Sequence, residues 1–336
     1  MKKESKSGII VFIIILLIAG GCFWYTRTHQ NQDTPRFSKS NPTGNPSGYS
    51  SDTIDYKNSG KEYIAALYVE GIIEDANSTY NQKWLLSTIN HLKHDPNNVA
   101  IAMYVNSPGG AVYQADEIYF ALKDYKKAGK LLYVYMGPLA ASGGYYISCP
   151  ADQIYANRNT LTGSIGVIAG QLIDATELLD EIGITIEAIH SGRNKVMGNF
   201  YSEITEEQEQ IMQSISDECY DQFVSIVAQN RGMNAKKVRE LADGRIYTAA
   251  QAIQYHLIDQ IDTWDNMINH IRQKELGLPD VKVITYRYEH KQTFRESFFG
   301  VMSQMQEKSI AAKLGIPVSV LNDMEKFNSY PAYLYK

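Results

Sequence analysis

The chain has 336 residues, of which 44% are hydrophobic and 21% charged, and its formal net charge is −5 at pH 7. This composition is that of a globular protein and excludes a wholly disordered or collagen-like chain. The mild acidity argues against nucleic-acid binding, which usually shows as clustered basic charge. Three scattered cysteines are too few for a disulfide scaffold or a CxxC metal site.

The N-terminus carries an uncharged run of 20 residues, at positions 7–26. A helix of this length spans about 30 Å, which matches the hydrocarbon core of a bilayer. Lysines precede the run and aromatic residues end it, so residues 1–6 are predicted to be a cytoplasmic tail and residues 7–26 a transmembrane anchor with the rest of the chain outside the cell. No signal-peptide cleavage site is evident; lipidation at Cys22 stays open as the alternative.

After the anchor, residues 27–61 are polar and rich in Pro, Gly and Ser, which predicts a flexible linker. Residues 62–288 are predicted to fold as one domain, and residues 289–336 to form a C-terminal extension. Apolar, β-rich runs predict strands at 63–69, 99–105, 131–136, 165–169, 185–189 and 281–286.

Between these runs lie two apolar stripes with the three-to-four-residue spacing of helices. The first runs from Val112 to Tyr125, and the second from Ile211 to Ile226. Thr205, with Gln208 three residues later, is typical of the capping box that begins a helix. Strands that alternate with helices in this way predict parallel βαβ units, and therefore an α/β domain.

Three glycine-rich loops each follow a predicted strand, where open α/β sheets bind their ligands. They are NSPGG at 106–110, GPLAASGG at 137–144 and TGSIG at 162–166. Ser142 is flanked by small residues, and the amide of Gly143 would point at whatever this serine attacks. Ser164 is a competing nucleophile. Each loop is also compatible with an ordinary turn, and the residues alone leave this open.

A nucleophilic serine needs a base. One candidate is His190, with Asp174 as its partner. The other is Lys195, because a lysine acts as a general base when desolvation favours its neutral amine; on spacing alone it is equally compatible with a solvated loop. His91 and His94 have no evident carboxylate partner and are interpreted as surface residues rather than metal ligands.

Five motifs, in order and at compatible spacing, resemble the signal peptide peptidase A family, which are membrane-bound bacterial Ser/Lys peptidases with the Clp/crotonase-like fold. The similarity runs from about residue 63 to residue 286. The family's usual glycine in the last motif is His256 here. The motifs are NSPGG (106–110), ASGGYYIS (141–148), TGSIGVI (162–168), SGRNKVMG (191–198) and DGRIYTAAQAIQYHLID (243–259).

The resemblance implies an α/β fold of the Clp/crotonase type, a repeated ββα superhelix, and assigns roles by motif position. Ser142 would be the nucleophile and Lys195 the general base, with Ser164 orienting the lysine amine. The amides of Gly109 and Gly143 would form the oxyanion hole. No metal or organic cofactor is implied.

The function implied is that of a membrane-anchored serine endopeptidase that hydrolyses remnant signal peptides and other short apolar peptides at the outer side of the cytoplasmic membrane. Because this chain holds one copy of the motifs, Ser142 of one subunit would meet Lys195 of the next in a closed homo-oligomeric ring, for which the family suggests an octamer. His190 occupies no position that the family uses. Two alternatives are a crotonase-like acyl-CoA enzyme and a non-enzymatic, membrane-tethered assembly protein.

The C-terminus raises a separate hypothesis. Pro331 disfavours helix at Tyr330, so the end of the chain is predicted to be extended. Proteases bind extended peptides by adding a strand to a site edge. The tail would then enter a catalytic groove and be trimmed by the enzyme itself; a frayed terminus or ordinary packing is the alternative.

Overall fold

The computed structural model describes residues 61–290 and 332–334. The chain divides into two compact units, residues 1–57 and 58–336, and the described residues all belong to the second. The predicted cytoplasmic tail and anchor, and most of the linker and C-terminal extension, therefore lie outside the described residues. Within 61–290 and 332–334, none of the helices has the length and apolar character needed to cross a membrane.

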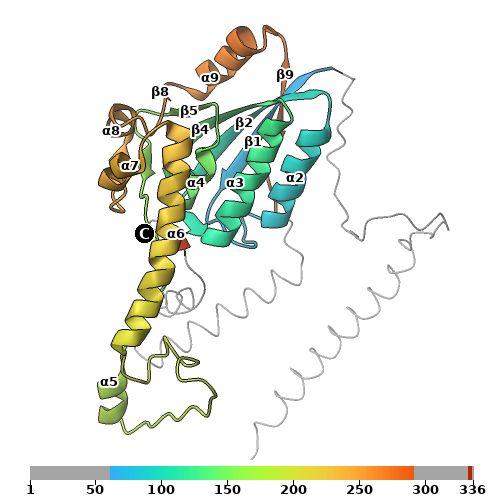
Figure 1. The fold of residues 1–336 in the computed structure, drawn as a ribbon. Coiled ribbons are helices and arrows are strands. Elements are labelled where there is room, and N and C mark those ends of the chain that lie inside the picture. The colour runs from blue at the N-terminus through green and yellow to red at the C-terminus, as the bar shows by residue number, and fades with distance from the viewer. Residues whose placement is uncertain (1–60, 291–331, 335–336) are drawn as a thin grey trace, which may run out of the picture. The chain divides into compact units, whose positions relative to one another are not determined.

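Among the described residues, eight strands form one sheet (Figure 1), whose main path runs β7-β6-β4-β2-β1-β9, with β5 beside β4 and β8 beside β5. All pairs in this sheet are parallel except β6 with β7. The predicted α/β architecture is confirmed. The strands are β1 (Tyr63–Glu70), β2 (Asn98–Ser107), β4 (Leu131–Ala141), β5 (Gln153–Ala156), β6 (Leu161–Gly163), β7 (Ile246–Thr248), β8 (Gln260–Ile261) and β9 (Lys282–Tyr286).

Helices cover both faces of the sheet, which explains why β1, β2 and β4 are almost continuously apolar rather than alternating. One face carries α2, α3 and α4, which lie in front of the strands in Figure 1. On the other face, Met267 and Ile268 of α9 pack against Ala100 and Tyr133. These helices are α2 (Gln82–His94), α3 (Val112–Lys127), α4 (Gly143–Ser148) and α9 (Trp264–His270), the last continued by a π-helical turn at Ile271–Glu275.

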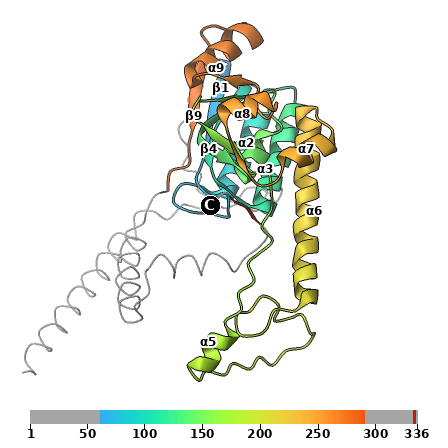
Figure 2. The ribbon, with the colours of Figure 1, turned by 90° about the vertical axis from the view of Figure 1, so that its left-hand side faces the viewer.

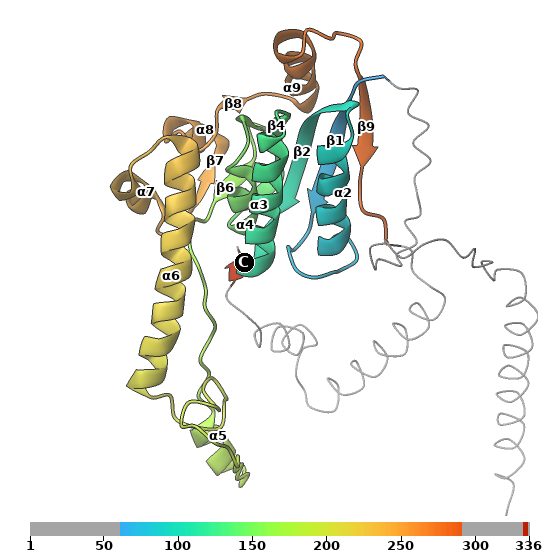
Figure 3. The same ribbon diagram turned by 45° about the vertical axis from the view of Figure 1, so that its right-hand side comes forward.

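A long helix, α6 (Glu206–Arg231), runs from the sheet domain to a segment that contains the short helix α5 (Thr176–Glu181), as Figures 2 and 3 show. We call residues 166–205 the arm. The predicted helix start at Thr205 is confirmed, because the Thr205 side chain accepts a hydrogen bond from the Gln208 amide, which is one of the two bonds of the predicted capping box. At its other end α6 is followed by α7 (Ala235–Leu241) and α8 (Ala249–Gln254).

Four of the six predicted strands are confirmed, as β1, β2, β4 and β9, and the two predicted helices as α3 and α6. The strands predicted at 165–169 and 185–189 are wrong. Residues 185–189 lie in the arm and 165–169 at its start, and neither range forms a strand, although Ile168 makes an isolated β-bridge. Their β-branched residues favour extended backbone, but a strand also needs a hydrogen-bonding neighbour along its length. Neither range is paired with a strand of the sheet among the described residues.

His256 occupies a backbone conformation that favours glycine, the residue that the resemblance leads one to expect there. It has φ of 59° just after α8. The His256 amide bonds to the Ile253 carbonyl and the Leu257 amide to the Ala252 carbonyl. This pair of hydrogen bonds is the Schellman motif, in which the left-handed residue is usually glycine.

The substitution His256→Gly should therefore raise the free energy of unfolding by about 1 kcal/mol, because a side chain in the left-handed region costs about that much. Thermal or denaturant unfolding measures the change. Gly232 is the matched control, because it ends α6 at φ of 62° and a Cβ atom added to it would meet no atom within 4 Å. Gly232→Ala should lower stability by a similar amount. A destabilised His256→Gly protein would contradict this account.

Candidate active site

The three glycine-rich loops lie side by side because they follow three neighbouring parallel strands. The sheet order places β4 between β2 and β6. Ala140 of β4 is paired with Ser107 of β2 on one side and with Thr162 of β6 on the other. The carboxyl ends of the three strands therefore meet at one edge of the sheet, where the sequence predicted the chemistry.

Ser142 forms the single-residue turn between β4 and α4. Its φ of 54° and ψ of −117° are unusual for a residue with a side chain, and such strain persists only where the surroundings hold it. Here the Ser142 amide donates to the Gly163 carbonyl at 2.8 Å, and its carbonyl accepts from the Tyr146 amide at 2.9 Å. Ser142 is only 1% exposed. A serine on a sharp strand-to-helix turn is the arrangement found for nucleophiles in α/β-hydrolases.

The turn that carries Ser142 packs directly on a short strand, β3 (Gly109–Ala111). A Cβ atom on Gly143 would lie 3.1 Å from the Gly109 Cα and 3.2 Å from the Gly110 nitrogen. A Cβ on Gly144 would lie 2.8 Å from the Ser107 carbonyl oxygen. The Gly-Gly pair after Ser142 is therefore required for close approach of two backbones. This contact brings the two predicted oxyanion-hole residues, Gly109 and Gly143, together.

The amides of Gly143 and Gly109 differ in their hydrogen bonding. The Gly143 amide belongs to the first turn of α4, where helical amides lack a partner within the helix. The Gly109 amide donates to the Ser107 side-chain oxygen at 3.1 Å. Ser107 is fully buried and was not singled out in the sequence. A substrate oxyanion would have to share or replace the Ser107 oxygen at this amide.

Ser164 lies beside Ser142, since Ala141 and Gly163 are paired and each serine is the next residue. Adjacent strands are about 4.8 Å apart. Ser164 also has a positive φ, 50°, and is held by its amide, which donates to the Arg245 carbonyl at 2.8 Å. The ring of Tyr247 lies 2.5 Å from where a Cβ of Gly163 would be. The 243–259 motif thus supports the Ser164 turn, a role that spacing alone did not reveal.

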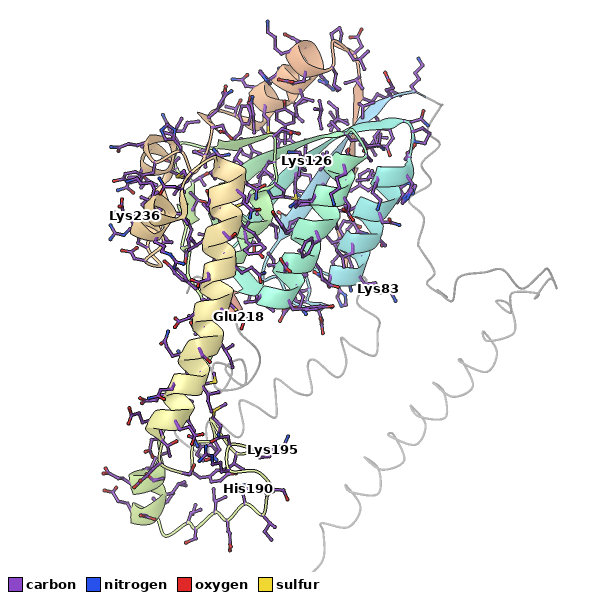
Figure 4. The ribbon with its side chains drawn as sticks, in the orientation of Figure 1. Lys83, Lys126, His190, Lys195, Glu218 and Lys236 are labelled. Carbon is purple, nitrogen blue, oxygen red and sulfur yellow. The ribbon has the colours of Figure 1, made fainter. Side chains whose placement is uncertain are left out.

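Lys195, in contrast, does not lie at this edge of the sheet within one chain. It sits in the arm, in a turn closed by its own amide to the Gly192 carbonyl, and it is exposed. Its neighbours Arg193 and Asn194 bond to Glu207 in the first turn of α6 at 2.6 Å and 3.2 Å. Figure 4 shows Lys195 and His190 at this end of α6.

The length of α6 separates Lys195 from Ser142. Helix α4 contacts α6 through Tyr146 and Phe223, whose ring centroids are 5.0 Å apart. Phe223 follows Glu207 by 16 residues, a rise of about 24 Å. The structure therefore brings together Ser142, Ser164, Gly109 and Gly143, and places Lys195 of the same chain far from them.

Comparison with known proteins assigns the chain to a family. The model of peptidase family S49 matches residues 124–278, which include Ser142, Ser164 and Lys195. A protein of Enterococcus faecium named signal peptide peptidase SppA is 36% identical over 231 residues, 67% of each chain. A protein of Synechocystis named as a protease is 37% identical over 209 residues, which are 62% of this chain and 73% of that protein. The chain belongs to peptidase family S49.

Membership of family S49 confirms the resemblance to signal peptide peptidases and makes this chain a serine peptidase. It favours the peptidase over both the acyl-CoA enzyme and the non-enzymatic assembly protein. Protease 4 of Haemophilus influenzae is 30% identical over 81% of this chain, which covers 46% of that longer protein. Among solved structures, a ClpP1 mutant from Listeria monocytogenes covers 60% of this chain and 94% of its own, with a TM-score of 0.41 and 16% identity. That likeness is too weak to support an argument.

The histidine alternative is not assembled within a chain of this S49 peptidase. His190 is exposed in the arm, where its Nδ1 lies 3.1 Å from the Gly192 carbonyl oxygen. The Asp174 carboxylate accepts a hydrogen bond from the Thr176 hydroxyl, and this bond lowers the Asp174 pKa. Cys149, the nearest thiol to Ser142 in sequence, is unreactive because burial raises its pKa to about 12. Among the described residues no cluster of His, Cys, Asp or Glu could hold a metal ion.

The arm of the S49 peptidase exposes an unusual amount of apolar surface. Ile189 is 100% exposed, six residues before Lys195. Large apolar residues exposed in number within one segment are typical of an interaction site. The other large apolar residues exposed in the arm are Ile168, Ile173, Leu178, Ile182, Ile184, Ile186 and Phe200.

A different segment bonds to each edge of strand β3. On one edge, Ile73 donates to the Gly109 carbonyl and accepts from the Ala111 amide. Alternate residues of a strand direct their amide and carbonyl groups to opposite edges, so those of Gly110 face away from Ile73. There they meet β10 (Ala332–Leu334), which pairs antiparallel with β3 and places Tyr333 opposite Gly110.

Proposed function

We propose that this S49 peptidase is a membrane-anchored endopeptidase with Ser142 as the nucleophile and Lys195 of a neighbouring subunit as the base. The observation that carries the proposal is the Ser142 turn. A buried serine is held in a strained conformation against the Gly109 and Gly143 backbones, at the carboxyl edge of the sheet. That geometry supports nucleophilic attack with stabilisation of an oxyanion by amides.

The reaction follows from these positions. The neutral amine of Lys195 takes the proton of the Ser142 hydroxyl as the oxygen bonds to the scissile carbonyl carbon. The amides of Gly143 and Gly109 stabilise the resulting oxyanion. The carbon–nitrogen bond then breaks, and Lys195 returns the proton to the leaving amine. Water, deprotonated by the same amine, hydrolyses the acyl-enzyme. Ser164, next to Ser142, accepts a hydrogen bond from the lysine amine and orients it.

Two observations support assembly into a ring. Lys195 lies about 24 Å along α6 from the part of the body that holds its own Ser142, so a second chain must supply the base. The arm that carries it exposes an apolar surface that a neighbouring body can cover. The contact joins different surfaces of two chains, and a contact of that kind must close into a ring or continue as a filament. A closed ring, with eight subunits as the family suggests, gives every site both residues.

The substrate class follows from the family and from the edge of β3 that faces away from Ile73, where β10 shows that an extended segment can pair. A relative is named signal peptide peptidase, and an extended apolar peptide added along β3 would cross in front of Ser142. The uncharged run at 7–26 supports placing this activity at the outer side of the cytoplasmic membrane, on remnant signal peptides. The domain limits 62–288 and the ββα superhelix of the Clp/crotonase type belong to the same proposal.

A serine-directed acylating reagent tests the catalytic assignment. Peptide mapping of the labelled protein should locate the adduct at Ser142, and Ser142→Ala should take up none. Ser148→Ala is the matched control, because Ser148 is a fully buried serine at the end of the same helix, and it should label as wild type does. An adduct at another serine, or equal labelling of Ser142→Ala, would refute the assignment.

The C-terminal tail is proposed as a tethered substrate. Strand β10 lies along the edge of β3 that a substrate would use and brings Leu334 opposite Gly109, one of the two oxyanion-hole glycines. Purified wild-type protein should therefore shorten at its C-terminus during incubation, whereas Ser142→Ala should keep its full length. Intact mass spectrometry measures both. Equal full-length masses in the two proteins would show that the tail is not cut.

A further inference from the structure

Helix α6 is attached to the body along its C-terminal half, from Tyr220 onward. Phe223, Val224, Ile226 and Val227 are buried there, whereas Ile215, two turns earlier, is exposed. The end of the helix is fixed by Arg231, which makes two hydrogen bonds with the Asp259 carboxylate at 2.7 and 3.0 Å. The N-terminal part of α6 extends to the arm that carries Lys195.

Helix α6 meets the helix that follows the nucleophile at Tyr146 of α4. The Tyr146 hydroxyl donates to the Asp116 carboxylate of α3 at 2.6 Å and accepts from the Gln222 side chain of α6 at 2.7 Å. Its ring packs edge-on against Phe223. Its amide donates to the Ser142 carbonyl. One fully buried side chain thus connects three helices and begins one turn from the nucleophile.

We propose that Tyr146 is a positioning residue that couples the Ser142 turn to the helix bearing the arm and Lys195. The inference rests on the proposed function, in which each arm delivers its lysine to a neighbouring site. Tyr146 then sets two geometries at once: the turn that holds Ser142 in its own chain, and the direction in which its own Lys195 is presented to the next chain.

Because α6 is long, a small change in its angle at Tyr146 would move the arm by a larger distance. A tilt of about 5° at Tyr146 would displace a point about 24 Å away along the helix by about 2 Å. A displacement of 1 Å can cost about a hundredfold in rate when it misaligns catalytic groups. Small changes in how Gln222 and Phe223 sit on Tyr146 should therefore change turnover more than they change substrate affinity.

Tyr146→Phe tests the proposal, with Tyr145→Phe as its matched control. Tyr145 lies on the same helix and is equally buried, but its hydroxyl donates to the Leu257 carbonyl rather than to α3 or α6. Each variant loses one buried hydroxyl. Tyr146→Phe should lower kcat for a peptide at least about tenfold relative to Tyr145→Phe, with similar KM and Tm. Equal kcat values in the two variants would overturn the proposal.

A second pair of variants on α6 keeps the test decisive if Tyr146→Phe folds poorly. Gln222→Leu removes the hydrogen bond to Tyr146 from the α6 side. Gln229→Leu, two turns along the same helix, removes a bond only to Ser225. Gln222→Leu should lower kcat, and adding Tyr146→Phe to it should lower kcat by much less than Tyr146→Phe does alone. Gln229→Leu should match wild type. A Gln222→Leu protein with wild-type kcat, or fully multiplicative effects in the double variant, would overturn the coupling.

Ser142→Ala and Lys195→Ala, measured alongside, separate this inference from the function on which it rests. If either retains activity, the catalytic assignment fails. If both are inactive while Tyr146→Phe behaves like Tyr145→Phe, only the positioning role fails.

Discussion

Ser142→Ala and Lys195→Ala should each lower kcat/KM for a peptide substrate by roughly 10⁴-fold or more, because loss of a nucleophile or its base has effects of that size in serine peptidases. Ser142 is the side chain beside the two glycine amides, and Lys195 is the amine that the family motif assigns to proton transfer. Steady-state hydrolysis of an apolar peptide, with circular dichroism to verify folding, measures both effects.

Two further variants test whether the loss of activity is specific to Ser142 and Lys195. His190→Ala should keep most of the activity, because His190 is exposed in the arm and bonds only to a nearby carbonyl among the described residues. Ser164→Ala should be intermediate, at about a hundredfold, since it orients the base without taking the proton. An active Lys195→Ala protein would end the assignment of lysine as the base, and an inactive His190→Ala protein would reopen the histidine alternative.

Mixing Ser142→Ala subunits with Lys195→Ala subunits should restore activity that neither has alone. If each site takes Ser142 from one chain and Lys195 from the next, random co-assembly at equal amounts leaves about a quarter of the sites with both residues. The recovered kcat should therefore approach a quarter of the wild-type value. The measurement needs subunits exchanged by co-expression or by refolding together.

The control for this experiment is a mixture of Ser142→Ala with the double variant Ser142→Ala/Lys195→Ala, which supplies no nucleophile and should stay inactive. Absence of recovery in the first mixture, with assembly verified by native mass, would contradict a site shared between chains. So would an experimental structure in which Lys195 Nζ reaches Ser142 Oγ of the same chain.

The sequence was a good guide to the elements that a single chain completes. Strands β1, β2 and β4 are long apolar runs, and α3 is a clear stripe, so their patterns predicted them. The segments 165–169 and 185–189 have a similar composition but are not paired with a strand of the sheet among the described residues, and no local pattern reveals that. Strands of two to four residues, such as β6 and β8, are too short to show a period.

The residues of the candidate site also divide into those that the sequence predicts and those that it does not. Ser142 and its glycines could be predicted because small residues between a strand and a helix imply close backbone contact. Ser107 and Tyr247 could not, since their roles depend on contacts made only after folding. Lys195 was assigned from the family motif alone. Its distance from Ser142 within one chain explains why spacing gave no indication of the pair.

The position of Lys195 near the N-terminal end of α6, far from Ser142 of the same chain, also bears on when the peptidase can cleave other proteins. In the proposed shared site, a newly made chain has a nucleophile without a base and a base without a nucleophile, so a dilute chain should be inactive. Hydrolysis per chain should rise steeply as chains become concentrated enough to meet, and fall again when they disperse. A peptidase regulated in this way would be switched on by its own assembly, so its activity would report how many chains have met.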